Sequence, residues 1–460
     1  MNANVCNTIV LNNLCCGCGV CVDVCPSEIL EMQFNRYGEY NPIIKNNKCK
    51  KNCNLCLRVC PFSEQAVLEN NIAKELWSDD ENIFYHEAIG FYIRCYCGYV
   101  SSENLRINSA SGGLLTWLLQ KMLQEHIVDY VVCVRPCKRK EKLFEFSVCR
   151  TTEEVRKCSK SCYYPVEISS VLKYIRENDG RYAITGLPCF IYSLRLVFKY
   201  KKIFDKRILY TFGLVCGQQK SKFFAEYICA LGGGNPNKLT SLQFRVKNRN
   251  RPASDYGLFY SCEDGSENTV YWTEGMSQAW CERYFTLNAC NYCDDLFAEL
   301  ADATFMDAWL PQYSKDYRGT SIVVVRNKLF QILFEEGIQR KDLNAEVIDV
   351  NIVIASQQGA LAIKRERLAE RFGWALKRGK SVISKRVQPK SVNIVKQLEF
   401  DIEYELGKAS KRAFLEQKYS GYGLNIFNKK MKTILRKKRL LQSISKVLFR
   451  IKRKILFWRK

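Results

Sequence analysis

The sequence predicts an α+β chain in three parts: a small N-terminal unit, a larger mixed α/β domain and a basic C-terminal helix. Three observations support this division. Two dense runs of cysteine lie within residues 1–68, short apolar runs alternate with helical patterns in residues 88–400, and lysine and arginine crowd residues 429–460. A chain of 460 residues is long enough for two or three domains. We set the domain limits at 1–68, 88–400 and 401–460, with a polar linker over 69–87 that includes Asp79, Asp80 and Glu81.

The first cysteine run has the spacing C-x2-C-x2-C-x3-C-P, and the second has one extra residue between its first two cysteines. The runs are Cys15, Cys18, Cys21 and Cys25 before Pro26, and Cys49, Cys53, Cys56 and Cys60 before Pro61. This spacing wraps 4Fe-4S clusters, and in two-cluster ferredoxins the fourth cysteine of each run binds the other cluster. We therefore expect a bacterial ferredoxin-like dicluster domain. One cluster would be held by Cys15, Cys18, Cys21 and Cys60, and the second by Cys49, Cys53, Cys56 and Cys25.

Disulfides, structural zinc and radical-SAM chemistry fit these cysteines less well. A disulfide framework is typical of short secreted chains, and residues 1–14 contain no apolar core of the length that a signal peptide needs. Structural zinc uses C-x2-C pairs, often with histidine, but the chain has two histidines and two x3-C-P endings that zinc does not explain. The spacing Cys49-x3-Cys53-x2-Cys56 matches radical-SAM enzymes and leaves the first run unexplained.

Composition limits the classes of function. Apolar residues make up 47% of the chain, and no run reaches the roughly eighteen apolar residues of a membrane helix. Abundant thiols indicate a reducing cytoplasm. Of the net charge of +24, residues 429–460 supply fourteen lysines and arginines without any acidic residue. Because the charge is concentrated in one tail without a known nucleic-acid fold, we expect no nucleic-acid partner.

Local patterns predict the regular elements. Residues 29–44 are typical of a hairpin with its turn at Tyr37-Gly38. In the large domain the predicted strands are Asp129–Val134, Tyr182–Thr185, Ile208–Val215 and Ser321–Val325, and the clearest helical patterns are Gly113–Gln124 and Val166–Arg176.

Four features of the large domain are candidates for chemistry. Ser111-Gly112-Gly113 opens a helical run, where free N–H groups favour an anion such as a phosphate, although an ordinary helix cap has the same pattern. The segments around Cys189 and Cys216 each follow a strand, and Cys290-x2-Cys293 lies in a loop. Two strand-end cysteines and a C-x2-C pair make a plausible four-thiolate set, but buried free cysteine is the commoner outcome.

Together these residues resemble the coenzyme F-420 hydrogenase/dehydrogenase β-subunit family over roughly residues 88–375. The likeness includes Ser111-Gly112-Gly113 with Thr116, Ser159-Lys160, Gly186-Leu-Pro188-Cys189, Cys216-Gly217, Phe244-Arg245 with Lys247, Cys290-x2-Cys293, Ala301-Asp302, Asp307-Ala-Trp309, Gly319-Thr320-Ser321 and Gln357-Gln358-Gly359. The chain has Met306-Asp307 where the family often has Gly-Asp, and Cys216-Gly217-Gln218 where it often has Cys-His-Gly. These departures leave the electron-accepting substrate open.

The resemblance implies a mixed α/β flavin-binding domain with a further 4Fe-4S cluster. Cys189, Cys216, Cys290 and Cys293 would hold this third cluster, and the flavin would be FAD, with FMN as the second choice. Cysteines left over as expected non-ligands are Cys6, Cys16, Cys95, Cys97, Cys133, Cys137, Cys149, Cys158, Cys162, Cys229, Cys262 and Cys281.

Residues for the flavin follow from the same likeness. Ser111, Gly112 and Gly113 would hold phosphate or ribityl oxygens, and Thr116 and Ser159 belong to the matching motifs. Lys160 would place a positive charge near the ring and so favour reduced flavin, unless it is a solvated surface lysine. Arg245 and Lys247 would bind an anionic substrate or cofactor, or are solvated.

The expected function is an iron–sulfur flavoprotein oxidoreductase that relays electrons between a hydride donor or acceptor and 4Fe-4S clusters. Its expected partner is a redox protein or a small-molecule hydride donor, and the resemblance suggests a setting in surface polysaccharide synthesis. The alternative is a non-catalytic electron-transfer subunit that serves a separate enzyme.

The C-terminal tail has an apolar stripe. Ile434, Leu441, Ile444, Leu448, Ile451, Ile455 and Trp458 recur at helical spacing, and basic residues cover the other face. Such a helix favours an anionic membrane surface at the inner face of the cell membrane. Packing on the large domain or on a partner, or a disordered basic tail, remain alternatives.

Overall fold

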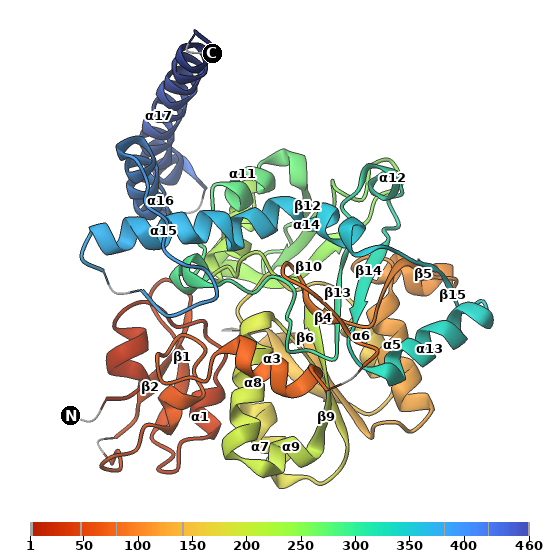
Figure 1. The fold of residues 1–460 in the computed structure, drawn as a ribbon. Helices are drawn as coiled ribbons and strands as arrows, with labels where there is room; N and C mark the ends of the chain where they lie inside the picture. Colours follow the sequence, from red (N-terminus) through yellow and green to blue (C-terminus); the bar gives the residue numbers. More distant parts are fainter. Residues whose placement is uncertain are drawn as a thin grey trace.

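The chain folds around one large mixed sheet. The computed structural model describes residues 3–46, 48–79, 81–139, 142–380, 382–421 and 423–458, without the side chains of residues 138 and 445–458. The sheet has eight strands in the order β15-β5-β14-β13-β9-β8-β6-β7 (Figure 1). In chain order these are β5 (Arg94–Val100), β6 (Tyr130–Arg139), β7 (Lys142–Cys149), β8 (Tyr182–Gly186), β9 (Ile208–Leu214), β13 (Ala303–Asp307), β14 (Ser321–Val325) and β15 (Leu343–Val347).

Parallel strands form the middle of this sheet. β6, β8, β9 and β13 run in one direction, and β5, β7, β14 and β15 form antiparallel pairs at the two sides. β8 and β14 are buried along their whole length, and the Ser-Ile-Val-Val-Val sequence of β14 is the β-branched run that a doubly covered strand needs. The predicted α+β class is therefore confirmed.

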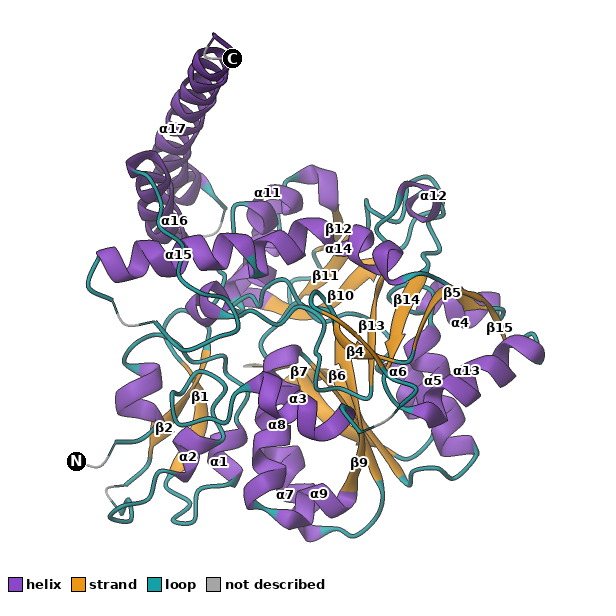
Figure 2. Cartoon of the chain, in the orientation of Figure 1, coloured by secondary structure: helices purple, strands orange, loops and turns teal. Residues whose placement is uncertain are grey.

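Helices cover both faces of the sheet (Figure 2). Alternation along β6 directs Val131 and Cys133 to one face, with α5, α6 and α13, and Val132 to the other, with α7 and α8. The helices are α1 (Val20–Asp23), α2 (Leu55–Arg58), α3 (Glu69–Trp77), α4 (Glu103–Asn108), α5 (Leu114–Gln124), α6 (Thr152–Lys157), α7 (Ser169–Glu177), α8 (Pro188–Tyr200), α9 (Lys202–Arg207), α10 (Phe223–Leu231), α11 (Met276–Cys281), α12 (Pro311–Ser314), α13 (Lys328–Gln339), α14 (Val350–Lys364), α15 (Glu366–Lys377), α16 (Ile394–Tyr419) and α17 (Asn425–Trp458).

The N-terminal unit packs against α7 and α8. Its hairpin, β1 (Leu30–Phe34) and β2 (Tyr40–Ile44), turns at Gly38, whose φ of 69° suits glycine. The N–H of Ile168 donates to the carbonyl of Cys18 at 2.9 Å. The Cys18 thiol lies 3.5 Å from the Ser193 hydroxyl on α8. The cysteine runs are thereby fixed against the large domain.

Two expectations about organisation need correction. Residues 69–77 of the predicted linker form α3, which buries Ile72, Ala73 and Trp77, and Asp80 lies outside the described residues. The predicted domain limit at residue 400 falls inside α16. Local pattern misses both because the partners of these helices are distant in sequence. The Trp77 indole, for example, donates to the carbonyl of Glu299.

The predicted elements of the large domain are confirmed with small shifts. β8, β9, β14 and α5 match their predicted ranges to within one residue. β6 runs on to Arg139 instead of ending near Val134, and α7 begins at Ser169 instead of Val166. Two small sheets add β3 (Phe84–His86) with β4 (Gly90–Tyr92), and β10 (Leu239–Val246), β11 (Gly257–Cys262) and β12 (Glu267–Tyr271).

The C-terminal helices form a hairpin that docks through aromatic rings. The ring centre of Phe285 lies 5.4 Å from that of Phe414 on α16 and 5.7 Å from that of Phe427 on α17. Met431 and Leu435 are buried beside them, so the first part of α17 packs on the protein. Beyond it Leu440 is 64% and Ile444 44% exposed, and the helix projects from the body (Figure 1). The side chains of Leu448, Ile451, Ile455 and Trp458 lie outside the described residues.

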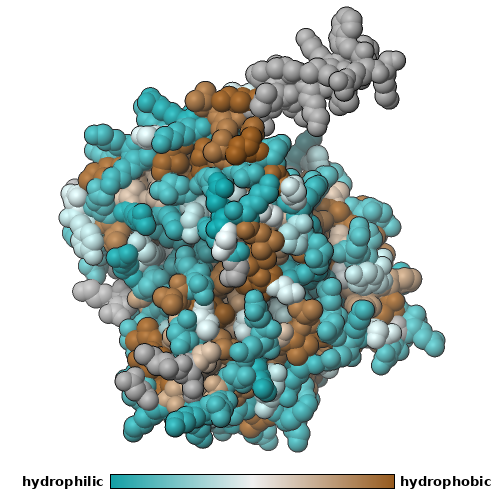
Figure 3. Space-filling view, turned by 60° about the vertical axis from the view of Figure 1, so that its left-hand side comes forward, coloured by the Kyte–Doolittle hydropathy of each residue, from teal (hydrophilic) through white to brown (hydrophobic). Residues whose placement is uncertain are grey.

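The described part of the chain contains no helix that combines the length and apolar character of a membrane span. One face of the molecule is mostly hydrophilic and is broken by hydrophobic patches (Figure 3).

Candidate functional site

A cavity of about 650 Å³ lies at the carboxyl ends of the parallel strands. Gly186 ends β8, Leu214 ends β9 and Asp307 ends β13, and all three line it. Ligands of open α/β sheets bind at this edge because neighbouring parallel strands deliver their following loops to one place. Its volume is in the range of small-molecule and cofactor sites.

The helix start at Ser111-Gly112-Gly113 is only partly on the cavity wall. Ser111 and Gly113 line the cavity, whereas Gly112 faces the sheet. The N–H of Gly112 donates to the Ser321 hydroxyl at 2.9 Å, and a Cβ there would come within 2.5 Å of the carbonyl oxygen of Gly98. Gly112 is thus required by close packing of backbone on β5 and β14. That this segment binds flavin stays a prediction.

Thr116, Ser159 and Lys160 also line the cavity. The Ser159 hydroxyl donates to the carbonyl of Asn108 at 2.8 Å. The Lys160 ammonium donates to the carbonyl of Ile107 at 3.3 Å. Burial, helped by the nearby positive charge of Arg245, lowers the pKa of Lys160 to about 8. Lys160 is therefore a half-buried cation at the cavity wall and not a solvated surface lysine.

Arg245 and Lys247 lie behind the wall instead of on it. The Arg245 guanidinium pairs with the carboxylate of Asp307 and lies 4.0 Å from the ring centre of Tyr256. Burial opposes its charge, but Asp307 raises the pKa of Arg245 overall. The Lys247 ammonium donates to the carbonyls of Arg106 at 2.6 Å and Ser111 at 2.8 Å, and burial lowers its pKa to about 6. Both side chains already have internal partners that hold the loops of the wall.

The four cysteines proposed for a third cluster come together beside the cavity. Cys189 opens α8 directly after β8, and Cys216 follows β9 and lines the cavity. Burial is the main cause that raises the pKa of Cys216 well above its usual value, and the thiols of Cys290, Cys189 and Cys293 add to it.

Lys364, at the end of α14, sits among these thiols and is 2% exposed. Burial opposes its charge, but Cys293, Cys216 and Cys290 raise its pKa overall. Sequence reasoning missed this lysine because nothing in the helical pattern of α14 marks it.

Gln219 also contacts this set. Its backbone N–H donates to the Cys290 sulfur and its side-chain amide donates to the Cys189 sulfur, each at 3.2 Å. Hydrogen bonds of this kind adjust the potential of iron–sulfur clusters. A four-thiolate set with N–H donors and a buried cation fits a 4Fe-4S cluster by the chemistry of its donors.

The structure also gathers the cysteines of the N-terminal runs in the crossed grouping. Burial raises the pKa of Cys60 well above its usual value, and Cys18 and Cys15 of the first run add to the shift. Burial likewise raises the pKa of Cys56, with contributions from Cys25, Cys53 and Cys49. The fourth cysteine of each run thus lies with the first three of the other. That these sets bind iron stays a prediction.

Cys16 connects the first set with the third. Expected from the sequence to be a non-ligand, it is 4% exposed, and its interactions with the thiols of Cys18 and Cys189 raise its pKa. The first and third cysteine sets therefore lie close together, separated by this thiol and by the first turns of α8.

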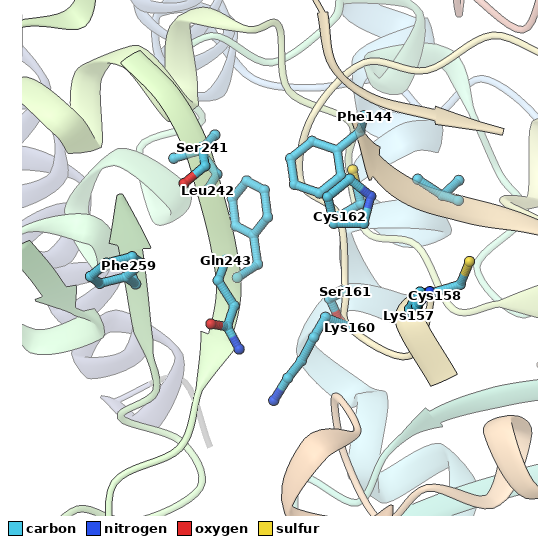
Figure 4. Close-up of a pocket in the computed structure, with 13 residues that line it drawn as sticks. Phe144, Lys157, Cys158, Lys160, Ser161, Cys162, Ser241, Leu242, Gln243 and Phe259 are labelled. Atoms are coloured by element: carbon cyan, nitrogen blue, oxygen red, sulfur yellow. The ribbon is translucent and has the colours of Figure 1, made fainter. Parts of the chain in front are cut away.

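A second, smaller cavity of about 330 Å³ lies beside the first, between β10 and the loop of residues 157–162. Lys160 reaches toward Gln243 across the gap, and the sulfur of Cys158 points away from the strand that carries Gln243 (Figure 4). Lys160 and Cys162 line both cavities, so this loop is the wall between them.

Two family profiles match the large domain. The profile of the N-terminal part of the coenzyme F420 hydrogenase/dehydrogenase β subunit matches residues 95–173. That of its C-terminal part matches residues 179–351. Together they cover more than half of the chain. The chain belongs to the coenzyme F420 hydrogenase/dehydrogenase β-subunit family.

Relatives of the family show how far the likeness reaches. A coenzyme F420-dependent sulfite reductase of Methanocaldococcus jannaschii is 22% identical over an alignment of 360 residues, which covers 75% of this chain and 49% of that protein. The chain thus spans about half the length of this relative. A chain of the F420-reducing NiFe hydrogenase complex of Methanosarcina barkeri aligns with a TM-score of 0.50 and 16% identity, covering 65% of this chain and 98% of that one. This second likeness shows the fold alone.

The profiles of the β-subunit family contain the third cysteine set and most of the cavity wall, whose residues 356–360 lie beyond the match. Ser111, Lys160 and the four cysteines from Cys189 to Cys293 all fall within the matched ranges. Lys364 lies beyond them, as do the two N-terminal cysteine runs and α17.

We predict that Gly112→Ala destabilises the fold by about 1–3 kcal/mol, because a methyl group there overlaps the backbone of β5 and β14. Gly217→Ala is the matched control on the cavity wall, where the nearest atom to the new methyl is 3.9 Å away. Thermal unfolding of anaerobically purified proteins measures both. Equal melting temperatures would show that the backbone at Gly112 has room to relax.

Proposed function

We propose that this protein is an iron–sulfur oxidoreductase that moves electrons between an organic hydride carrier in the 650 Å³ cavity and three 4Fe-4S clusters. A bound flavin or deazaflavin would supply two-electron hydride chemistry, and the clusters would supply one-electron steps. Membership of the β-subunit family supports the oxidoreductase class.

One observation carries the proposal: cavity, third cysteine set and first cysteine set are contiguous. Cys216 belongs to the third set and lines the cavity. Cys189 of the same set contacts Cys16, which contacts Cys18 of the first set. A chain of this order suits electron transfer from an organic ring in the cavity through the third cluster to the first, and from there to the second set, whose cysteines are all partly exposed.

The residues of the cavity wall have separate tasks in this proposal. Lys160 places a positive charge where a reduced, anionic ring or a phosphate would be stabilised. Arg245 and Asp307 fix each other, which holds the end of β13 in place. Trp309 and Tyr256 close the wall with aromatic surface and exclude water.

The identity of the carrier is the finer part of the proposal. We propose FAD, with FMN second. The names of the sulfite reductase and of the hydrogenase complex refer to coenzyme F420, and this favours a deazaflavin as the hydride donor or acceptor that meets the flavin. A setting in surface polysaccharide synthesis rests on resemblance alone and stays a prediction.

A non-catalytic electron-transfer subunit is the second candidate function. The hydrogenase likeness favours it, because the matched chain is one component of a complex. The two candidates differ in one measurement. A catalytic protein reduces an organic substrate alone, whereas a transfer subunit bleaches its cofactors with a hydride donor but turns over only with a partner protein.

We predict about twelve iron atoms per chain after anaerobic reconstitution, from three four-thiolate sets. The double variant Cys290→Ala/Cys293→Ala should retain about eight, because it removes two ligands of one cubane. Cys281→Ala, at an exposed cysteine outside the three sets, should keep the full amount. Iron and acid-labile sulfide analysis decides the matter. Zinc in place of iron, or unchanged iron in the double variant, would contradict the assignment.

We predict that denaturation releases a fluorescent flavin, and that Lys160→Met weakens its retention about tenfold because a charged hydrogen-bond donor is lost. Lys157→Met is the control, since Lys157 is exposed and lies outside the larger cavity. Fluorescence and mass spectrometry of the released compound give amount and identity. A released deazaflavin would replace FAD as the bound hydride carrier. If a protein with its full iron content releases neither compound, the result favours a protein that transfers electrons through its clusters alone.

The exposed part of α17 remains our proposed contact with an anionic membrane surface. We predict that full-length protein floats with anionic liposomes at low salt and less so at high salt. A chain that ends at Arg439 should stay at the bottom. This truncation keeps Phe427, Met431 and Leu435 in the core, which a cut at Asn428 would disturb. Flotation of both chains, or of neither, would contradict the membrane assignment.

A further inference from the structure

Three cysteines outside the three proposed cluster sets meet at the loop of residues 157–162. They are Cys133 of β6, Cys149 at the end of β7 and Cys158, which follows the last turn of α6. The sequence alone predicts all three to be non-ligands. Cys133 and Cys149 are buried and Cys158 is partly buried. This thiol trio comes from three separate elements, and its closeness is therefore a property of the fold.

Strand register and a helix cap bring the trio together. Cys149 pairs with Val131 and Cys133 pairs with Ser147, so the two cysteines are diagonal neighbours on one face of the β6–β7 ladder. α6 then begins with a capping box between Thr151 and Glu154 and buries Val155 on the same face. The helix returns the chain so that Cys158 lies over the two strand cysteines.

The sulfur positions match those of ligands to a single ion. Sγ of Cys149 lies 3.7 Å from Sγ of Cys133 and 3.7 Å from Sγ of Cys158, and all three sulfurs lie within 4.8 Å of one another. Tetrahedral zinc with zinc–sulfur bonds of about 2.3 Å holds its thiolate sulfurs about 3.8 Å apart. A cubane cluster gives each thiolate its own iron and spreads the sulfurs further, so the trio suits one ion and not a cluster.

A disulfide explains the trio less well. Diagonal neighbours of an antiparallel pair have Cα atoms about 7–8 Å apart, whereas disulfides join Cα atoms about 4.4–6.8 Å apart. Cys133 and Cys149 are therefore poorly placed for a bond. A bond between Cys149 and Cys158 would leave Cys133 as a spare thiol in contact with both.

One side of the trio faces the larger cavity. Cys133 and Cys158 line it, together with Ser159 and Lys160. Within the described residues no histidine, aspartate or glutamate joins the three sulfurs. Zinc with three protein ligands keeps a fourth position for water or for a bound molecule, and here that position would open toward the cavity.

We propose that Cys133, Cys149 and Cys158 form a zinc site with three thiolate ligands, whose fourth position takes an oxygen or nitrogen donor from the cavity. The site is separate from the three iron–sulfur sets and does not depend on the proposed function. An oxygen ligand bound there would be polarised by the ion next to the position where Lys160 places its charge.

The test uses full-length chain, purified without oxygen, given one equivalent of Zn²⁺ and desalted. We expect about one zinc per chain. X-ray absorption at the zinc edge reports on zinc and not on iron, and it should give three sulfurs at about 2.3 Å and one lighter ligand. Cys149→Ser should lose most of the zinc without changing the iron content, because one of the three thiolate ligands is removed. Cys262→Ser is the matched control, because Cys262 and Cys229 also form a buried sulfur pair, at 3.6 Å, but without a third cysteine.

Several results would overturn the site. A shell of four sulfurs places the zinc in a cluster set, and an equal zinc content in Cys149→Ser and wild type places it elsewhere. Peptide mapping after anaerobic alkylation would also overturn the site if it finds Cys149 joined to Cys158, because the two cysteines then form a disulfide and do not bind a metal. If Cys149→Ser fails to fold, Cys158→His is the second variant. It should keep zinc with two sulfurs and an imidazole nitrogen, and loss of zinc there contradicts the proposal.

Discussion

The register of the parallel strands is the constraint on which the site depends. Gly186 of β8 pairs with Gly213 of β9, and Cys189 and Cys216 each follow three residues later. Parallel strands release their chains at the same edge of the sheet, so these two cysteines emerge side by side. Gly213 itself has no room for a side chain, because a Cβ would meet that of Ala298 at 2.3 Å. The tight packing of this strand fixes where Cys216 stands relative to the cavity.

The sequence predicted those features that depend on residues close together in the chain. Cysteine spacing predicted the crossed grouping of Cys25 and Cys60, because it is the spacing of two-cluster ferredoxins, in which the fourth cysteine of each run binds the other cluster. The short apolar runs of β8 and β14 predicted strands, because strand formation depends on residues next to one another in the chain. Lys364 and Cys16 were missed since their importance arises from contacts with segments far away in the chain: Lys364 meets Cys216, and Cys16 meets Cys189. The thiol trio was missed because its three cysteines have no ligand-like spacing and become neighbours only through strand register.

The roles of glycine and of basic residues were the hardest to predict from the sequence pattern. The Ser-Gly-Gly helix start suggested phosphate binding at all three positions, but Gly112 is required by the approach of the Gly98 carbonyl. Arg245 and Lys247 suggested anion binding, but Asp307 pairs with Arg245, and backbone carbonyls accept hydrogen bonds from the Lys247 ammonium. A buried cation needs such partners. Basic residues that the fold buries therefore stabilise the fold itself instead of binding a ligand.

The contrast among these cations indicates where an anionic carrier would bind. Lys220 lines the cavity, yet its ammonium donates to the carbonyls of Ala279 and Tyr284 and to the Thr286 hydroxyl, all within 3.2 Å. Lys160 donates to the carbonyl of Ile107 at the longer distance of 3.3 Å, and its pKa near 8 reflects burial without a carboxylate partner. A phosphate or a reduced ring beside Lys160 would supply the missing negative charge and raise that pKa, because an opposite charge favours the protonated amine. This pairing would stabilise the bound carrier, whereas the hydrogen bonds of Lys220 already stabilise the fold.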